Sequence, residues 1–129
     1  MVIDTSALLA VLFAEEDRDV YLRHLCGRER KTISPLNALE ADIVVQSRKG
    51  DPGHQALERI LYNCEIVIIP FDSAMRTLAY EGWLRFGKGR HQASLNMGDC
   101  CAYALARYLN EPLLYKGNDF VRTDIQSVI

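Results

Sequence analysis

Short apolar runs that are typical of buried strands recur along the chain, separated by longer segments with helical spacing. The clearest run covers residues 65–70, Glu-Ile-Val-Ile-Ile-Pro. Its unbroken β-branched side chains favour a strand that is buried on both faces of a parallel sheet. Apolar runs at residues 1–3 and 113–115 predict two further strands, because polar capping or turn residues follow each of them closely.

The segments between these runs repeat their apolar residues every three or four positions, which predicts amphipathic helices. Asp4, Ser34 and Asp72 each precede such a segment, and all three are residue types that favour a helix N-cap. A Gly-Asp-Pro-Gly sequence at residues 50–53 predicts a break after the third helix. The predicted helices span residues 7–12, 20–25, 35–49, 55–62, 73–87 and 100–109.

Strands that alternate with helices predict an α/β fold, a three-layer sandwich in which helices flank a mainly parallel central sheet. The 129 residues, 49% of them hydrophobic, suit one compact domain over residues 1–129. We see no internal repeat, linker or low-complexity segment, and no apolar stretch long enough for a membrane span.

Charge and cysteine content narrow the classes of function. The formal net charge of -2 argues against a general polyanion binder, although two divalent cations bound to acidic side chains would reverse its sign. The four cysteines include no Cys-x-x-Cys pair, which argues against a zinc site and favours free thiols in a reducing compartment. The N-terminus lacks the pattern of a secretory signal, so we expect a cytoplasmic protein.

Three aspartates fall where a parallel sheet places its ligand sites. Asp4 follows the first strand, Asp99 begins the last helix, and Asp119 follows the strand at residues 113–115. Because ligands bind beyond the carboxyl ends of parallel strands, these three carboxylates are candidates for one site. The alternative for each is an ordinary N-cap or turn residue.

Glu40 gives a separate indication of chemistry. It falls within an apolar stripe on the third helix and is therefore expected to point inward; the stripe comprises Leu36, Leu39, Ile43 and Val44. A desolvated carboxylate costs several kcal/mol unless a cation or good hydrogen bonds offset that cost. The alternative partner is an arginine in an internal salt bridge.

A cluster of carboxylates without thiolate or imidazole suits one or two hard cations, Mg²⁺ or Mn²⁺. The chemistry that matches such a cluster is phosphodiester hydrolysis by a water that the metal activates. Thr5 and Ser6 could orient such a water or a carboxylate, or could cap the first helix. Beside Asp99, a glycine-rich loop carries Arg85, Lys88, Arg90 and His91, and these residues with Lys116 either bind the phosphates of a substrate or form a solvated surface.

Four ordered motifs now make a family resemblance visible: residues 2–8 (Val-Ile-Asp-Thr-Ser-Ala-Leu), 39–40 (Leu-Glu), 95–100 (Leu-Asn-Met-Gly-Asp-Cys) and 113–120 (Leu-Leu-Tyr-Lys-Gly-Asn-Asp-Phe). Together they resemble the PIN-domain ribonucleases, most closely the VapC toxins of prokaryotic toxin–antitoxin pairs. The resemblance covers essentially the whole chain. It implies a homodimeric endoribonuclease that cleaves structured RNA such as tRNA and meets DNA only through its antitoxin, a VapB-type protein that inserts a segment into the catalytic groove.

The resemblance assigns Asp4, Glu40 and Asp99 to the three principal acids of the family. Many relatives carry the fourth acid two residues before Asp119, where this chain has Gly117, so Asp124 is an alternative to Asp119. The alternative function is a PIN fold that binds RNA or protein with little or no catalysis.

Overall fold

The computed structural model describes residues 1–129 and contains one parallel sheet. Its strands lie in the order β3-β2-β1-β4 and comprise β1 (Val2–Ile3), β2 (Lys31–Ile33), β3 (Ile66–Ile68) and β4 (Leu113–Leu114). Val2 pairs with Thr32 on one side and with Leu113 on the other. All four strands point the same way, so their carboxyl ends lie along one edge of the sheet.

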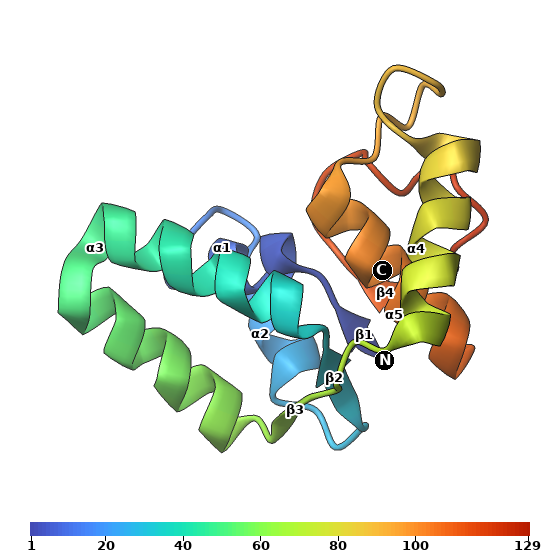
Figure 1. Cartoon of the computed structure of the whole chain (residues 1–129). Helices are drawn as coiled ribbons and strands as arrows, with labels where there is room; N and C mark the ends of the chain where they lie inside the picture. The colour runs from blue at the N-terminus through green and yellow to red at the C-terminus, as the bar shows by residue number, and fades with distance from the viewer.

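Five helices cover the sheet on both faces and complete the predicted three-layer sandwich (Figure 1). They are α1 (Thr5–Leu12), α2 (Arg18–Leu25), α3 (Pro35–Asn63), α4 (Ser73–Phe86) and α5 (Met97–Leu109). Ile3 packs in a core with Leu8 and Leu57, whereas its neighbour Val2 packs in a second core with Tyr103. Successive strand residues point to opposite faces, so the two cores are the two helix–sheet interfaces. The predicted α/β class is confirmed.

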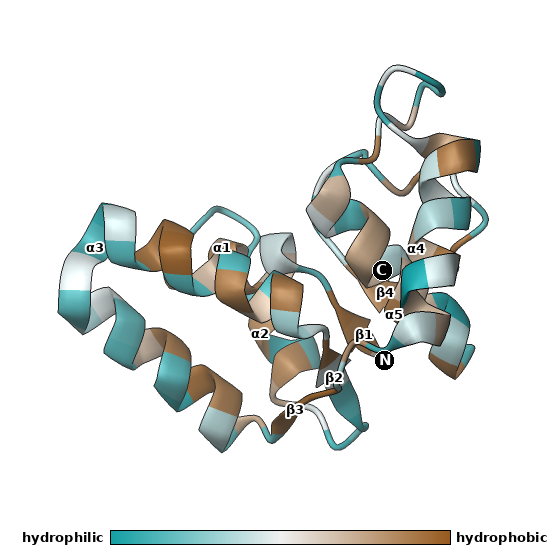
Figure 2. Cartoon of the chain, viewed as in Figure 1, coloured by the Kyte–Doolittle hydropathy of each residue, from teal (hydrophilic) through white to brown (hydrophobic).

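The break predicted in the third helix is present as a reversal of the chain. Gly50 has φ 63° and ψ -157°, a left-handed backbone that glycine adopts without strain. Residues 35–49 form the first arm of α3 and residues 51–63 the second arm; the arms meet at the reversal and diverge from it in Figure 1. Hydropathy colouring shows a mostly hydrophilic end of α3 at this reversal (Figure 2).

The prediction that the run at residues 65–70 is buried on both faces is wrong. Ile66 is buried, but Val67 is 50% exposed and Ile68 is 48% exposed. β3 is an edge strand with β2 as its only neighbour, and α5 packs instead against β1 and β4. The strand is therefore buried at Ile66 and partly open to solvent at Val67 and Ile68.

The inward direction predicted for the stripe on α3 is also wrong. Leu36, Leu39 and Ile43 are 37%, 53% and 57% exposed, whereas the small residues Ala38 and Ala41 are buried. The small side chains allow the first arm to approach α1 closely, which turns the larger apolar side chains outward. None of the helices is long and apolar enough to cross a membrane.

Candidate active site

Asp4 is the most buried of the predicted acids. It follows β1 and caps α1, as expected from the sequence, and its Oδ2 accepts hydrogen bonds from Ser6 N at 3.0 Å and Ser6 Oγ at 2.5 Å. Ser6 Oγ also accepts a hydrogen bond from Lys116 N at 2.9 Å, just after β4. Ser6 therefore orients Asp4 and joins the ends of two neighbouring strands, while Asp4 rather than Ser6 provides the cap.

Asp99 lies in the first turn of α5, which begins at Met97 instead of after Asp99. Asn96 caps the helix: Asn96 Oδ1 accepts from Asp99 N at 2.9 Å, and Asp99 Oδ2 accepts from Asn96 N at 2.9 Å. This reciprocal capping box holds one carboxylate oxygen of Asp99 and leaves the other available for a ligand.

Glu40 lies on the exposed side of the first arm of α3, and its carboxylate extends toward the start of α5, near Asp99. The residue as a whole is exposed, but its carboxylate lies against Gly98: a Cβ added to Gly98 would be 2.5 Å from Glu40 Oε2. Glu40 therefore lies beside Asp99, as the site prediction requires, but not because the apolar stripe on its helix is buried.

The four acids form one electrostatic cluster. The pKa of Asp99 is raised to about 7, mainly by burial and then by repulsion from Asp4, Asp119 and Glu40, against the lowering effect of the bond from Asn96. Burial also raises the pKa of Asp4 and of Glu40, and repulsion from another acid adds to each shift. None of the four carboxylates forms a salt bridge.

This donor set fits a hard divalent cation. It offers carboxylate oxygens alone, and no lysine or arginine neutralises them. A different acidic group lies between the arms of α3, where His54 Nε2 is 3.1 Å from Asp42 Oδ1 and 3.9 Å from Glu58 Oε1. That group is half-buried, joins the two arms through the contact between His54 and Asp42, and includes none of the four acids.

The two alternatives for the fourth acid lie in different surroundings. Asp119 is exposed, and its charge raises the pKa of both Asp4 and Asp99. Asp124 instead binds Arg85 Nη1 at 2.9 Å and Arg107 Nη1 at 2.7 Å. Burial would raise the pKa of Asp124, but the hydrogen bond from Arg85 and the charge of Arg107 hold it below its usual value.

Most of the predicted RNA-binding side chains already have partners within the chain. Lys116 Nζ pairs with Glu15 and with Asp17, Arg85 pairs with Asp124, and the Arg90 guanidinium lies 5.0 Å from the centre of the Trp83 ring. His91 Nδ1 accepts a hydrogen bond from Ala93 N at 3.0 Å. Lys88 is exposed and its side chain makes no hydrogen bond or ion pair; it lines an apolar pocket of about 590 Å³ together with Asn96 and Met97, at the start of α5.

Sequence reasoning missed Asn37, which is 1% exposed and hydrogen-bonded to Ser34 in its own segment and to Thr5 and Gly98 in two others. Its only signal in the sequence was an amide in the first turn of a helix, between apolar neighbours.

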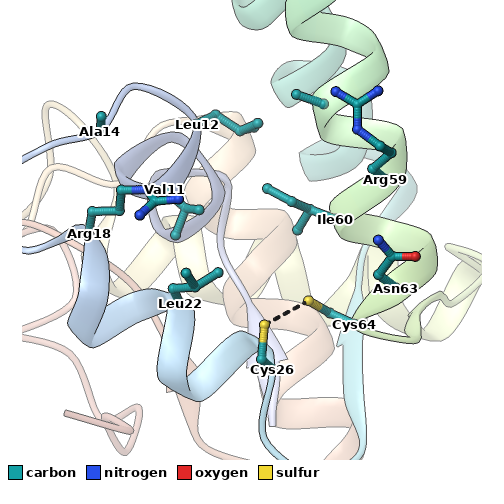
Figure 3. A pocket seen from close by; sticks show the side chains of 11 residues that line it. Val11, Leu12, Ala14, Arg18, Leu22, Cys26, Arg59, Ile60, Asn63 and Cys64 are labelled. Carbon is teal, nitrogen blue, oxygen red and sulfur yellow. Dashed lines mark hydrogen bonds between the residues drawn. The ribbon is translucent and has the colours of Figure 1, made fainter.

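A second apolar groove of about 550 Å³ lies between α1, α2 and the second arm of α3 (Figure 3). It contains none of the four acids; Cys26 and Cys64 lie at its base.

Comparisons with known proteins define the family to which this fold belongs. The PIN domain family matches residues 1–126, and the chain belongs to that family. Within it, the chain is 41% identical over 128 residues to the ribonuclease VapC of Mycolicibacterium smegmatis, with 99% of each chain covered. It is 38% identical over 128 residues to the ribonuclease VapC30 of Mycobacterium tuberculosis, covering 99% of this chain and 98% of that protein. The resemblance to VapC ribonucleases is thus confirmed.

Solved structures agree with this placement at the level of the fold. The Mycobacterium tuberculosis toxin VapC20, described as cleaving the Sarcin-Ricin loop, superposes with a TM-score of 0.80 at 16% identity over 98% of this chain and 97% of that one. A toxin–antitoxin complex from Klebsiella pneumoniae superposes with a TM-score of 0.72 at 14% identity, covering 95% of this chain and 92% of that one.

Proposed function

We propose that this protein is a metal-dependent endoribonuclease and the toxin of a VapBC-type pair. The observation that carries the proposal is the convergence of four carboxylates, without a basic partner, at the carboxyl edge of a parallel sheet. Burial, with repulsion from the other three acids added to it, raises the pKa of Asp99 to about 7, so a bound cation would relieve an unfavourable interaction that the fold itself creates.

Asp4, Glu40, Asp99 and Asp119 would hold Mg²⁺ or Mn²⁺, as one ion or two. Such an ion supplies a water nucleophile at neutral pH and neutralises charge that develops on the phosphate. Asp119 is the better fourth acid, because Asp124 is occupied by two arginines. Ser6 and Asn96 orient two of the acids: Ser6 donates a hydrogen bond to Asp4 and Asn96 donates one to Asp99, which fixes the direction of the remaining oxygen of each carboxylate.

Structured RNA is the proposed substrate, with tRNA as an example. Lys88, in the loop after α4, is the predicted RNA-binding lysine that no acid holds within the chain, because Lys116 and Arg85 are paired with acids. Phosphate contacts position a nucleic acid without reading its bases, so base selection must come from the exposed loops.

The partners proposed are a VapB-type antitoxin, which would link the toxin to DNA, and a second copy of this chain. An exposed apolar surface on α3, α4 and α5 supports self-association; it comprises Leu36, Leu39, Ile43, Tyr80, Trp83 and Met97. We place the activity in the cytoplasm, where RNA is available and the four free thiols would stay reduced.

The decisive experiment incubates purified protein with total RNA in Mg²⁺, in Mn²⁺ and in chelator, and maps the new RNA ends. We expect cleavage that needs a divalent ion and is abolished in Asp99→Asn. Asp19→Asn, which changes an exposed aspartate on α2, is the matched control and should cleave normally. Cleavage that survives the chelator would overturn the proposal. RNA binding without cleavage, unaffected by metal or by Asp4→Asn, would instead support the binding module.

A further inference from the structure

One buried amide joins three parts of the chain that are far apart in sequence. Asn37 Nδ2 donates hydrogen bonds to the Gly98 carbonyl at 3.1 Å and to Thr5 Oγ1 at 3.4 Å. Asn37 Oδ1 accepts from Ser34 Oγ at 2.5 Å, and the Asn37 carbonyl accepts from Thr5 Oγ1 at 3.0 Å. Every polar atom of the side chain has a partner, as a buried amide requires.

Each segment that this amide joins carries one acid of the cluster. Thr5 directly follows Asp4, Gly98 directly precedes Asp99, and Glu40 lies one turn further along the helix that bears the amide. The carboxylates repel one another, which would push these segments apart. An uncharged amide holds the segments together without neutralising the acids or competing for a cation.

Gly98 contributes the second part of this arrangement. A Cβ at this position would lie 2.5 Å from Glu40 Oε2 and 3.6 Å from Glu40 Cδ. The absence of a side chain therefore lets the Glu40 carboxylate approach the backbone next to Asp99. Its φ is not positive, so the backbone does not require glycine. The requirement comes from the space that Glu40 occupies.

We propose that Asn37 and Gly98 are positioning residues that set the spacing of Asp4, Glu40 and Asp99 for a divalent ion. This inference rests on the proposed metal-dependent activity. Both residues would act through the acids, which makes them positioning residues. Asn37 holds the segments that carry Asp4, Glu40 and Asp99 close to one another through its hydrogen bonds. Gly98 leaves the space that the Glu40 carboxylate occupies.

Gly98→Ala separates positioning from stability. Alanine suits a helix better than glycine, so the variant should fold with an unchanged or higher Tm. Its Cβ should displace Glu40 and raise the Kd for Mn²⁺ about tenfold or more, the range typical of groups that orient metal ligands. Mn²⁺ binding is measured directly by electron paramagnetic resonance. In a Glu40→Ala background the same change should have little further effect, because the displaced carboxylate is gone.

Asn37→Ala tests the amide itself. We expect a lower Tm and a Kd for Mn²⁺ raised to a similar degree, with cleavage partly restored at high Mn²⁺ concentration. Leu57→Ala is the matched control, because it removes a fully buried side chain from the second arm of α3. It should lower the Tm while leaving the Kd for Mn²⁺ unchanged, which shows that lost stability alone does not weaken the site.

The outcomes distinguish this inference from the proposed function. If the wild-type protein binds Mn²⁺ and Asp99→Asn does not, while Gly98→Ala and Asn37→Ala bind as tightly as wild type, the positioning role is refuted and the metal site stands. If the wild-type protein binds no divalent ion, the proposed function fails and the positioning role with it.

Discussion

The sulfur atoms of Cys26 and Cys64 lie 3.3 Å apart, although 38 positions separate the two residues in sequence (Figure 3). Cys26 follows α2 and Cys64 follows α3, so the pair joins the carboxyl ends of two helices. Cys26 is exposed, whereas burial raises the pKa of Cys64 to about 11. Cys26 is therefore the thiol that an oxidant reaches first.

We expect hydrogen peroxide to convert this pair into a disulfide. Peroxide oxidises Cys26 to a sulfenic acid with release of water, and Cys64 then displaces a second water to form the S–S bond. Closing a loop of this length would stabilise the fold by about 4 kcal/mol in the chain-entropy account, and the Tm should rise accordingly. Mass spectrometry should show a loss of two hydrogens.

Cys26→Ser is the control for the disulfide and should show neither the mass change nor the rise in Tm. Cys100 and Cys101 are buried, and burial raises the pKa of each thiol to about 11, so they should stay reduced. Peroxide treatment that produces only intermolecular disulfides would contradict the prediction.

The acid cluster should make the metal-free protein less stable as pH rises. The pKa of Asp99 is raised from 3.8 to about 7, so the folded chain holds this proton more tightly than the unfolded chain does. The resulting stabilisation is complete below pH 3.8 and is lost as the pH approaches about 7. Each unit of pKa difference corresponds to about 1.4 kcal/mol.

Denaturant unfolding of wild type and Asp99→Asn in chelator, at pH 4 and pH 8, measures this effect. Asparagine carries no charge, so the variant should be more stable than wild type by at most about 4 kcal/mol at pH 8, at about 1.4 kcal/mol for each unit of raised pKa, with solvent screening of the partly exposed carboxylate reducing this value; the two should be similar at pH 4. Mg²⁺ should stabilise wild type at pH 8 and leave the variant unchanged. Equal stability of the two proteins at both pH values would show that Asp99 is not under strain.

Local patterns predicted the helices and three of the four strands, because their signals lie close together in sequence, but they did not predict β2. The caps at Asp4, Ser34 and Asp72 are all present, and the helix is broken at Gly50 within the predicted range, although the reversal of the chain there was not predicted. The start of α5 was misplaced because Asn96, and not Asp99, is the cap.

The sequence predicted less well which side chains face the core and which distant segments meet. An apolar stripe on the first arm of α3 does not reveal which layer covers it, and Leu39 and Ile43 face outward. Glu40 reaches the acid cluster for a reason that periodicity could not show, since the space comes from Gly98 on another helix. Asn37 likewise acts through residues more than thirty positions away.

The two lysines assigned to RNA should behave differently. Lys116 is held by Glu15 and Asp17, whereas Lys88 makes no ion pair. In the catalytically inactive Asp99→Asn background, Lys88→Ala should weaken RNA binding and reduce the slope of log Kd against log salt by about 0.7 to 0.9, the value for one phosphate contact. Lys116→Ala should leave that slope unchanged. Fluorescence anisotropy over a range of salt concentrations measures both, and an equal loss of slope would place Lys116 at the RNA as well.

The outward apolar surface on α3, α4 and α5 should mediate self-association. Leu36, Tyr80, Trp83 and Met97 line one pocket of about 590 Å³, so the three helices contribute to a continuous surface. An apolar patch of this kind usually marks an interface, because leaving it in water is unfavourable.

Ile43→Asp places a charge on this surface, at a position where the wild-type side chain is 57% exposed. The folded monomer should tolerate the charge, but a dimer that buries it should not, because an unpaired carboxylate costs several kcal/mol to desolvate. Sedimentation velocity should therefore show a dimer for wild type and a monomer for the variant. Tyr62→Asp is the matched control: its side chain is 84% exposed on the second arm of α3, and the variant should remain dimeric. A monomeric wild-type protein, or a dimer that survives Ile43→Asp, would remove this surface as the interface.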